Sequence, residues 1–298
     1  MTDTQAPWSA RGTVSAWQRF WFCSEPQASS LQAVRVGLSL IAAWYFASHW
    51  LDVGLWFSGP GVLATETLGQ FFEAGDMVET AKWRLSPVYW LNSATALRAY
   101  LVIGILLAIA ASTLNRTRVP AVLLWLWCVW LANRSLLISG PEELVLVFGL
   151  AYLAIASPID PLHWSTAMAR RLLQVHTAMW IAITGLTMLS STIWWDGTGS
   201  IAVAAPTGRR LMDLTDILSN PWLHEPLTHA LVMTAILAPI AIWFRPMRKP
   251  ALVALLAWTL VVGMLTSQWM YLLTIAVLLQ AFRFASAGPP ESATDLGG

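Results

Sequence analysis

The amino-acid sequence predicts an all-α fold, a polytopic membrane bundle of about eight transmembrane helices. Of the 298 residues, 57% are hydrophobic and only 11% are charged. About a quarter of the residues of an average soluble protein are charged. Apolar runs long enough to cross a bilayer recur along the chain, and short basic turns alternate with two long acidic loops. Together these observations favour a membrane protein over a soluble one.

The apolar runs give the expected spans in order. The first three lie at about 31–51, 94–114 and 119–138. The fourth runs from the turn at 139–143 to about 157, and the fifth begins near Arg171. The sixth lies at about 224–244, where Pro239 is expected to kink or break the helix. Residues 250–284 hold two short spans joined at Thr266-Ser267-Gln268.

Three regions follow from this pattern. Residues 1–27 form an N-terminal segment whose stretch 12–23, with Trp17 and Trp21 beside Arg19, is typical of an amphipathic helix at the membrane surface. Residues 28–284 form the transmembrane domain. Residues 285–298, rich in Gly, Ser, Pro and acids, are expected to be a disordered cytoplasmic tail.

Basic residues predict the orientation. The turns between the second and third, fourth and fifth, and sixth and seventh spans are basic, whereas the long loops at about 52–93 and 192–222 carry most of the acids. In the second loop, residues 209–218 could form a short interfacial helix. The positive-inside rule places both termini in the cytoplasm and both loops outside. We expect a multi-pass protein of the inner (cytoplasmic) membrane.

The composition also bears on partners and cofactors. A net charge of +1 is too balanced to suggest nucleic acid as a partner, which leaves the lipid bilayer. Cys23 and Cys128, the two cysteines, are expected at different depths, so no disulfide is predicted. The five histidines have no metal-ligand spacing, and no metal site is predicted.

The fifth span and the turn after it, residues 174–197, carry a polar stripe. Its side chains recur every three or four residues and so share one helical face: Thr177, Trp180, Thr184, Thr187 and Ser191. Such a face turns toward other helices or a cavity. The candidates for lining a cavity are His176, Trp180, Thr184, Thr187, Trp194 and Trp195. Each also has a plainer interpretation, as a helix-packing group or an interfacial aromatic anchor.

A second polar group flanks the short turn after the third span. It consists of Asn133, Arg134, Glu142 and Glu143. One interpretation is a polar mouth at the outer surface that binds an anionic or peptide substrate. The other is an Arg–Glu pair combined with ordinary helix capping, because Pro141 and the two acids suit a helix start.

The order of these features resembles the HTTM-domain proteins, bacterial relatives of the membrane part of vitamin K-dependent gamma-glutamyl carboxylase. The resemblance covers about residues 28–284. The motifs that carry it are AVRVGLSLIAAWYF at 33–46, WFSGPGVL at 56–63, NRSLLISGPEEL at 133–144, LLQVHTAMWIAITGLTML at 172–189, WWDG at 194–197 and the closing pair of short spans at 251–284.

The resemblance implies a helical membrane domain with an internal cavity. In the carboxylase, that cavity brings a reduced naphthoquinone to a lysine base within a Gly-x-Lys-Lys-Leu pattern. The matching stretch here is 185–189, where Thr187 and Met188 replace both lysines. Neither side chain can serve as that base. We therefore expect a cavity for a quinone, such as an isoprenoid quinone, or a lipid, without glutamate carboxylation. Whether any reaction occurs stays open, and no catalytic residue is assigned.

An alternative hypothesis is a non-enzymatic membrane protein. Other HTTM-like proteins take part in maturing secreted peptide toxins. By this resemblance, the two outer loops would form a docking surface for a secreted peptide or protein, or for a membrane or periplasmic protein partner, during its maturation or export.

Overall fold

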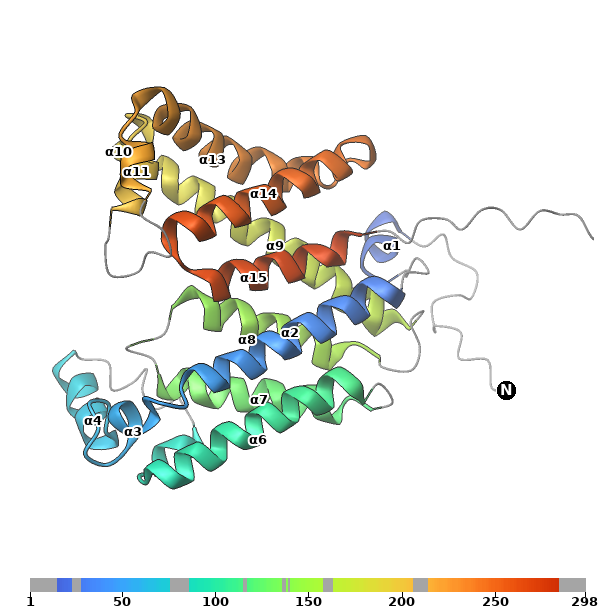
Figure 1. Ribbon diagram of the computed structural model, residues 1–298. Helices are drawn as coiled ribbons and strands as arrows, with labels where there is room; N and C mark the ends of the chain where they lie inside the picture. The colour runs from blue at the N-terminus through green and yellow to red at the C-terminus, as the bar shows by residue number, and fades with distance from the viewer. Residues whose placement is uncertain are drawn as a thin grey trace, which may run out of the picture.

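The computed structural model describes residues 15–22, 28–75, 86–114, 117–135, 138, 140–157, 163–205 and 214–283. Within these ranges every regular element is helical. The main helices pack side by side in one bundle (Figure 1). They are α2 (Ala28–Ser48), α6 (Ala94–Thr113), α7 (Val119–Arg134), α8 (Pro141–Ile155), α9 (Trp164–Leu189), α13 (Pro221–Ala241), α14 (Arg248–Thr266) and α15 (Trp269–Leu278).

Shorter helices lie at the two ends of the bundle (Figure 1). At one end, called the loop end here, are α3 (Val53–Phe57), α4 (Thr65–Ala74), η1 (Pro87–Trp90), α10 (Thr192–Trp195), α11 (Gly199–Ala204) and α12 (Thr215–Leu218). At the opposite end, the α1 end, are α1 (Ala16–Phe22), η3 (Arg245–Met247) and η4 (Leu279–Phe282). The described parts of the two long loops therefore lie at the same end.

In the described ranges, four helices are long and apolar enough to cross a membrane: Ser30–Ser48, Ala94–Thr113, Trp164–Leu189 and Arg245–Thr266. Two further apolar helices, Val119–Arg134 and Trp269–Phe282, are shorter. Large apolar side chains such as Leu106, Ile183 and Val253 stay exposed on the outside of the bundle, where lipid is the matching solvent. These features support an all-helical membrane protein with several transmembrane helices.

A helix lies at each of the eight expected positions, although several bounds differ by a few residues and two predictions differ more. α9 begins at Trp164, before Arg171, because the His163 side chain accepts a hydrogen bond from Ser165 N and starts the helix earlier. α13 continues through Pro239 to Ala241, so the helix is not broken there. Pro239 is buried, and prolines inside membrane helices are tolerated where neighbouring groups satisfy the backbone that the proline frees.

Several sequence predictions fall partly or wholly outside the described residues. α1 lies within the expected amphipathic stretch 12–23, of which residues 12–14 and 23 are not described. Of the expected helix at 209–218, only residues 214–218 are described, and α12 lies among them. Cys128 is a free, buried thiol, whereas Cys23 and the tail 285–298 are not described.

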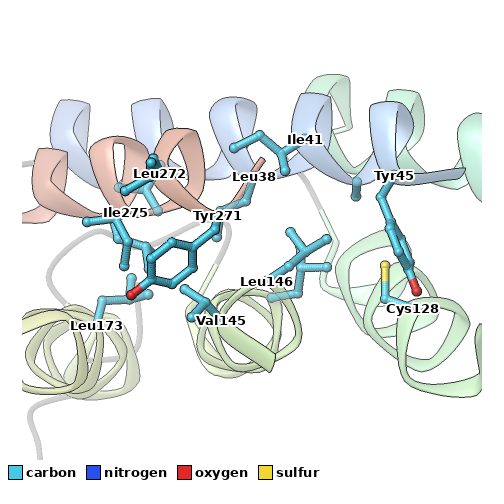
Figure 2. Close-up of a cluster of buried hydrophobic side chains, with 14 of the residues drawn as sticks. Leu38, Ile41, Tyr45, Cys128, Val145, Leu146, Leu173, Tyr271, Leu272 and Ile275 are labelled. Carbon is cyan, nitrogen blue, oxygen red and sulfur yellow. The ribbon is translucent and has the colours of Figure 1, made fainter. Parts of the chain in front are cut away.

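The core is built around α2, which packs against α6, α8 and α15. Figure 2 shows Leu38 and Ile41 of α2 in one buried cluster with Leu272 of α15 and Leu146 of α8. Glycines allow this close approach. A Cβ at Gly104 of α6 would lie 2.8 Å from the Phe46 ring of α2. Small residues at helix contacts are typical of membrane bundles, because association there depends on close van der Waals packing.

Charges separate between the two ends of the bundle. The described acids all belong to loop-end segments: Asp52, Glu66, Glu73, Glu142, Glu143, Asp196, Asp216 and Glu225. The described basic residues lie in the half of the bundle toward α1, except Arg98 and Arg134. One of them holds α1 in place, since Arg171 Nε donates to Phe20 O at 2.9 Å and its guanidinium lies 4.9 Å from the Phe20 ring centre.

Candidate functional site

The tight turn between α14 and α15 is the centre of the candidate site. Ser267 in this turn has φ of 56°, and no other non-glycine residue in the described ranges has a positive φ. This left-handed conformation costs roughly 1–2 kcal/mol for a residue with a Cβ. The Ser267 hydroxyl is also buried, and it has no hydrogen-bond partner among the described residues. Strained positions of this kind concentrate at functional sites, where the surrounding packing maintains them.

Two hollows flank this turn, and together they are called the turn cleft here. The first measures about 540 Å³ and is lined by Pro141, Trp180, Ile183, Thr184, Thr187, Met188, Ser190, Ser191, Trp194, Gln268 and Tyr271. The second measures about 530 Å³ and is lined by Trp44, Ser48, Glu142, Thr266, Ser267, Gln268, Trp269, Met270 and Tyr271. Gln268 and Tyr271 line both hollows, so the hollows meet at the start of α15.

The first hollow lies against the polar stripe of α9. The Thr184 hydroxyl donates to Trp180 O at 3.0 Å, and the Thr187 hydroxyl donates to Ile183 O at 2.9 Å. Since each hydroxyl proton is already used within the helix, these groups can only accept hydrogen bonds from a ligand. Tyr271 points across from α15 toward α9 (Figure 2), and its hydroxyl lies beside Thr184. Gln268, exposed at the turn, offers a ligand both an amide donor and an acceptor.

The second hollow is mostly apolar, with one charged side chain among its lining residues. That side chain is Glu142, which is half-buried at the start of α8. The Ser48 and Thr266 hydroxyls donate to backbone carbonyls of their own helices. The indole Nε1 of Trp269 is buried, and no residue in the described ranges accepts a hydrogen bond from it. A neutral ligand therefore suits this cleft better than an anion, which the Glu142 carboxylate would repel.

Four of the six residues predicted to line a cavity meet in the first hollow, namely Trp180, Thr184, Thr187 and Trp194. Trp195 does not line either hollow. Its side chain is 63% exposed, and its Nε1 donates to Leu189 O at 2.7 Å. This geometry fits the alternative interpretation of Trp195 as an interfacial anchor.

His176 lies in a separate slot, deeper between α8 and α9. The slot measures about 20 Å³, enough for about one water molecule. The His176 ring bonds the Tyr152 hydroxyl through Nδ1 at 3.0 Å and stacks on Phe148 with 6.1 Å between ring centres. Trp180 lines both this slot and the first hollow, so the two spaces adjoin at this side chain.

The second predicted group, the polar mouth, is divided by the fold. Glu142 lines the turn cleft. Glu143 is buried, and its Oε2 accepts from Gly140 N at 2.7 Å, so it caps the start of α8. The backbone carbonyl oxygen of Asn133 accepts a hydrogen bond from the Tyr89 hydroxyl at 2.9 Å. The turn cleft thus joins one residue of this group to four of the cavity group.

Arg134 is fully buried and not at a surface mouth. Its Nη2 donates to Phe57 O at 3.1 Å. Its guanidinium lies 5.6 Å from the Phe57 ring centre and 5.3 Å from that of Tyr89, within the range of cation–π attraction. In the described part of the chain, Nε and Nη1 have no hydrogen-bond partner, and Arg134 makes no ion pair with either glutamate. The expected Arg–Glu pair is therefore replaced by aromatic and carbonyl contacts.

Sequence reasoning missed Ser267, Gln268 and Tyr271 as members of a site. The Thr-Ser-Gln sequence indicated a turn, but no pattern in the sequence showed that this turn faces the stripe of α9. Among the described residues, no grouping of three or more His, Cys, Asp or Glu side chains is arranged to hold a metal ion.

Comparisons of the chain with protein-family models, with curated proteins and with solved structures gave no match.

Proposed function

We propose that this protein is an HTTM-like integral membrane protein whose turn cleft binds a neutral lipophilic ligand, a quinone or a lipid. The observation that carries the proposal is the pair of adjoining hollows of about 540 and 530 Å³ around a strained turn. Sites for small molecules measure roughly 300–1,000 Å³ and combine apolar walls with a few polar groups. The turn cleft has both properties.

Helix lengths support access to the cleft from the lipid. At about 1.5 Å per residue, the apolar helix Trp269–Phe282 extends about 21 Å, whereas α9, with its 26 residues, extends about 39 Å. The hydrocarbon core of a bilayer is about 30 Å thick. With Phe282 at the membrane surface of the α1 end, the Thr266–Gln268 turn lies within or at the edge of the hydrocarbon. Irregular backbone is tolerated at such depth only where it is buried in protein or lines a cavity.

All eight main helices cross the membrane in this proposal. Their directions alternate along the chain, and the short helices α8 and α15 pack between longer ones. The charge separation between the two ends supports an orientation in the inner membrane with the α1 end and both termini in the cytoplasm.

The side chains of the cleft suggest how a ligand would be held. Trp180 and Trp194 offer flat aromatic faces for a ring or an acyl chain. Tyr271 and Gln268 would bond a carbonyl or hydroxyl head group. The proposal does not include glutamate carboxylation. Lys249, the one lysine among the described residues, lies at the opposite end of the bundle, and Thr187 and Met188 supply no base.

The test is mass spectrometry of the organic extract from detergent-purified protein. We expect one neutral isoprenoid quinone or lipid at near-stoichiometric amount. Thr184→Trp, which fills the first hollow, should lower its amount at least tenfold. Leu186→Trp is the matched control, since it adds the same indole two residues away at a position 57% exposed and outside the lining. Recovery of bulk phospholipid alone, in equal amounts from all three proteins, would overturn the proposal.

A further inference from the structure

We propose a second lipid site at the α1 end, a groove between α13 and α14 that binds an acyl chain of an anionic phospholipid. The phosphate of this lipid is held by Arg245 and Lys249 in the turn between the two helices. The site depends on the bundle being in a membrane, but it is separate from the turn cleft. Its ligand has an anionic head group, whereas the proposed ligand of the turn cleft is neutral.

The groove exists because small side chains face each other across the two helices. Ala238 and Ala241 of α13 and Ala251 and Ala254 of α14 line a space of about 320 Å³. Met233 and Met247 also line the groove. Between Met233 and Ala241 the groove follows α13 for roughly 12 Å. These dimensions suit a single chain of methylene groups.

The surroundings of the groove are apolar. The rim residues Met233, Leu237 and Met247 are 54%, 53% and 56% exposed. Thr234 supplies the one side-chain polar atom among the lining residues. In a membrane, such a groove is filled by hydrocarbon, because its walls gain dispersion contacts with an acyl chain.

The head-group position is set by the turn from α13 to α14. Arg245 and Lys249 are exposed, and neither makes a side-chain hydrogen bond or ion pair with any described residue. Met247 lies between them in the chain and Pro250 follows Lys249, and both Met247 and Pro250 line the groove. The two charges therefore lie where the acyl chain emerges. Arg248 differs from them, because its Nε donates to Ile242 O at 3.1 Å and closes the turn.

The charge distribution selects an anionic head group. Every described carboxylate belongs to the loop end, so none competes for these two cations. Other basic residues of the α1 end, among them Arg118, Arg171 and Arg283, add to the positive potential. Each basic side chain near the surface favours an anionic lipid by about fivefold, so Arg245 and Lys249 together favour it by about 25-fold.

Native mass spectrometry of the full chain tests this site. The detergent-purified protein is titrated with phosphatidylglycerol and phosphatidylcholine of identical acyl chains. We expect a preference for phosphatidylglycerol on the order of 25-fold in the first bound lipid. The double variant Arg245→Gln/Lys249→Gln should lose most of this preference. Ala254→Phe, which blocks the groove and keeps the charges, should weaken the binding of both lipids at least fivefold.

The matched control is Arg19→Gln/Arg283→Gln. It removes the same charge from exposed positions at the same end that are not among the residues lining the groove, and it should keep the preference. Equal affinity of the native protein for both lipids would reject the site. If the control lost the preference for phosphatidylglycerol to the same extent, the preference would come from the overall positive potential of the α1 end and not from this site. Unchanged lipid binding by Ala254→Phe would show that the groove has no role. Quinone content of the organic extract, measured in parallel, reports the turn cleft independently.

Discussion

The guanidinium of Arg134, the last residue of α7, donates a hydrogen bond to the carbonyl oxygen of Phe57, the last residue of α3. This contact connects the bundle to the loop-end helices. It also places a positive charge at zero exposure between two aromatic rings, and the nitrogens Nε and Nη1 have no hydrogen-bond partner among the described residues. Burying a charge without a counter-charge is costly, and a planar cation stacked on ring faces recovers part of that cost.

The contrast between two substitutions of Arg134 tests this balance. Arg134→Lys keeps the buried charge but loses the planar stacking, so we expect a loss of about 2–4 kcal/mol in unfolding free energy. Arg134→Met removes the charge together with its desolvation cost, so its loss should be smaller. Thermal unfolding in detergent, followed by tryptophan fluorescence, measures both. Arg98→Gln, at an exposed position of the same end, should change little. If Arg134→Met lowered the unfolding free energy more than Arg134→Lys does, this account would be contradicted.

Gly263 allows the α14–α15 turn to close. A Cβ there would lie 2.8 Å from the Trp269 ring, so Gly263→Ala should force the two helices apart and lower the unfolding free energy by about 1–3 kcal/mol. The matched control is Gly69→Ala in α4, where a Cβ meets nothing within 4 Å. There the substitution should raise stability by roughly 0.5–1 kcal/mol, through helix propensity alone. The same sign for both substitutions in thermal unfolding would refute the steric argument.

Ser267 provides a test of the strain in the turn. Glycine adopts the φ of 56° found there without steric cost, so Ser267→Gly should raise the unfolding free energy by about 1 kcal/mol. Ser267→Ala removes the unpaired hydroxyl but keeps the strain, so it should raise the unfolding free energy less than Ser267→Gly does. Both are measured by denaturation in detergent. If Ser267→Gly were the less stable of the two, the turn would not be strained as its geometry indicates.

His49 should make stability depend on pH. The residue lies just beyond α2, where its Nδ1 bonds Tyr45 O at 2.9 Å and its ring stacks on Phe57. Burial lowers the pKa of His49 below its ordinary value of 6.5, outweighing the opposite effects of the Tyr45 carbonyl and of Asp52. Below pH 6.5 the unfolded chain therefore binds more protons than the folded one. Stability should fall with acidification, by at most about 1.4 kcal/mol per pH unit.

A pH series of thermal unfolding between about pH 8 and pH 5 measures this effect. His49→Gln should flatten the decline below the ordinary histidine pKa. His229→Gln, at an exposed position of α13, should leave the decline unchanged. A decline of equal steepness in the His49 variant would assign the pH dependence to another group.

The sequence predicted the helices well because each span carries its own signal. An apolar run of about twenty residues forms a helix in lipid whatever its neighbours do, because no other local structure satisfies its backbone there. Helix boundaries were less accurate where the signal was a single residue, as at His163 and Pro239. Four stripe and aromatic residues of the first hollow were also predictable from their spacing along one helix.

What the sequence determined by itself was therefore the class of fold, the helix positions and the polar face of α9, all of which depend on neighbours within a few turns. Only the tertiary structure decided that Ser267, Gln268 and Tyr271 complete the cleft, that Arg134 is buried against Phe57, and that alanines of α13 and α14 leave a groove. These contacts depend on which helices are adjacent and at what depth, and adjacency is set by packing between segments far apart in the chain.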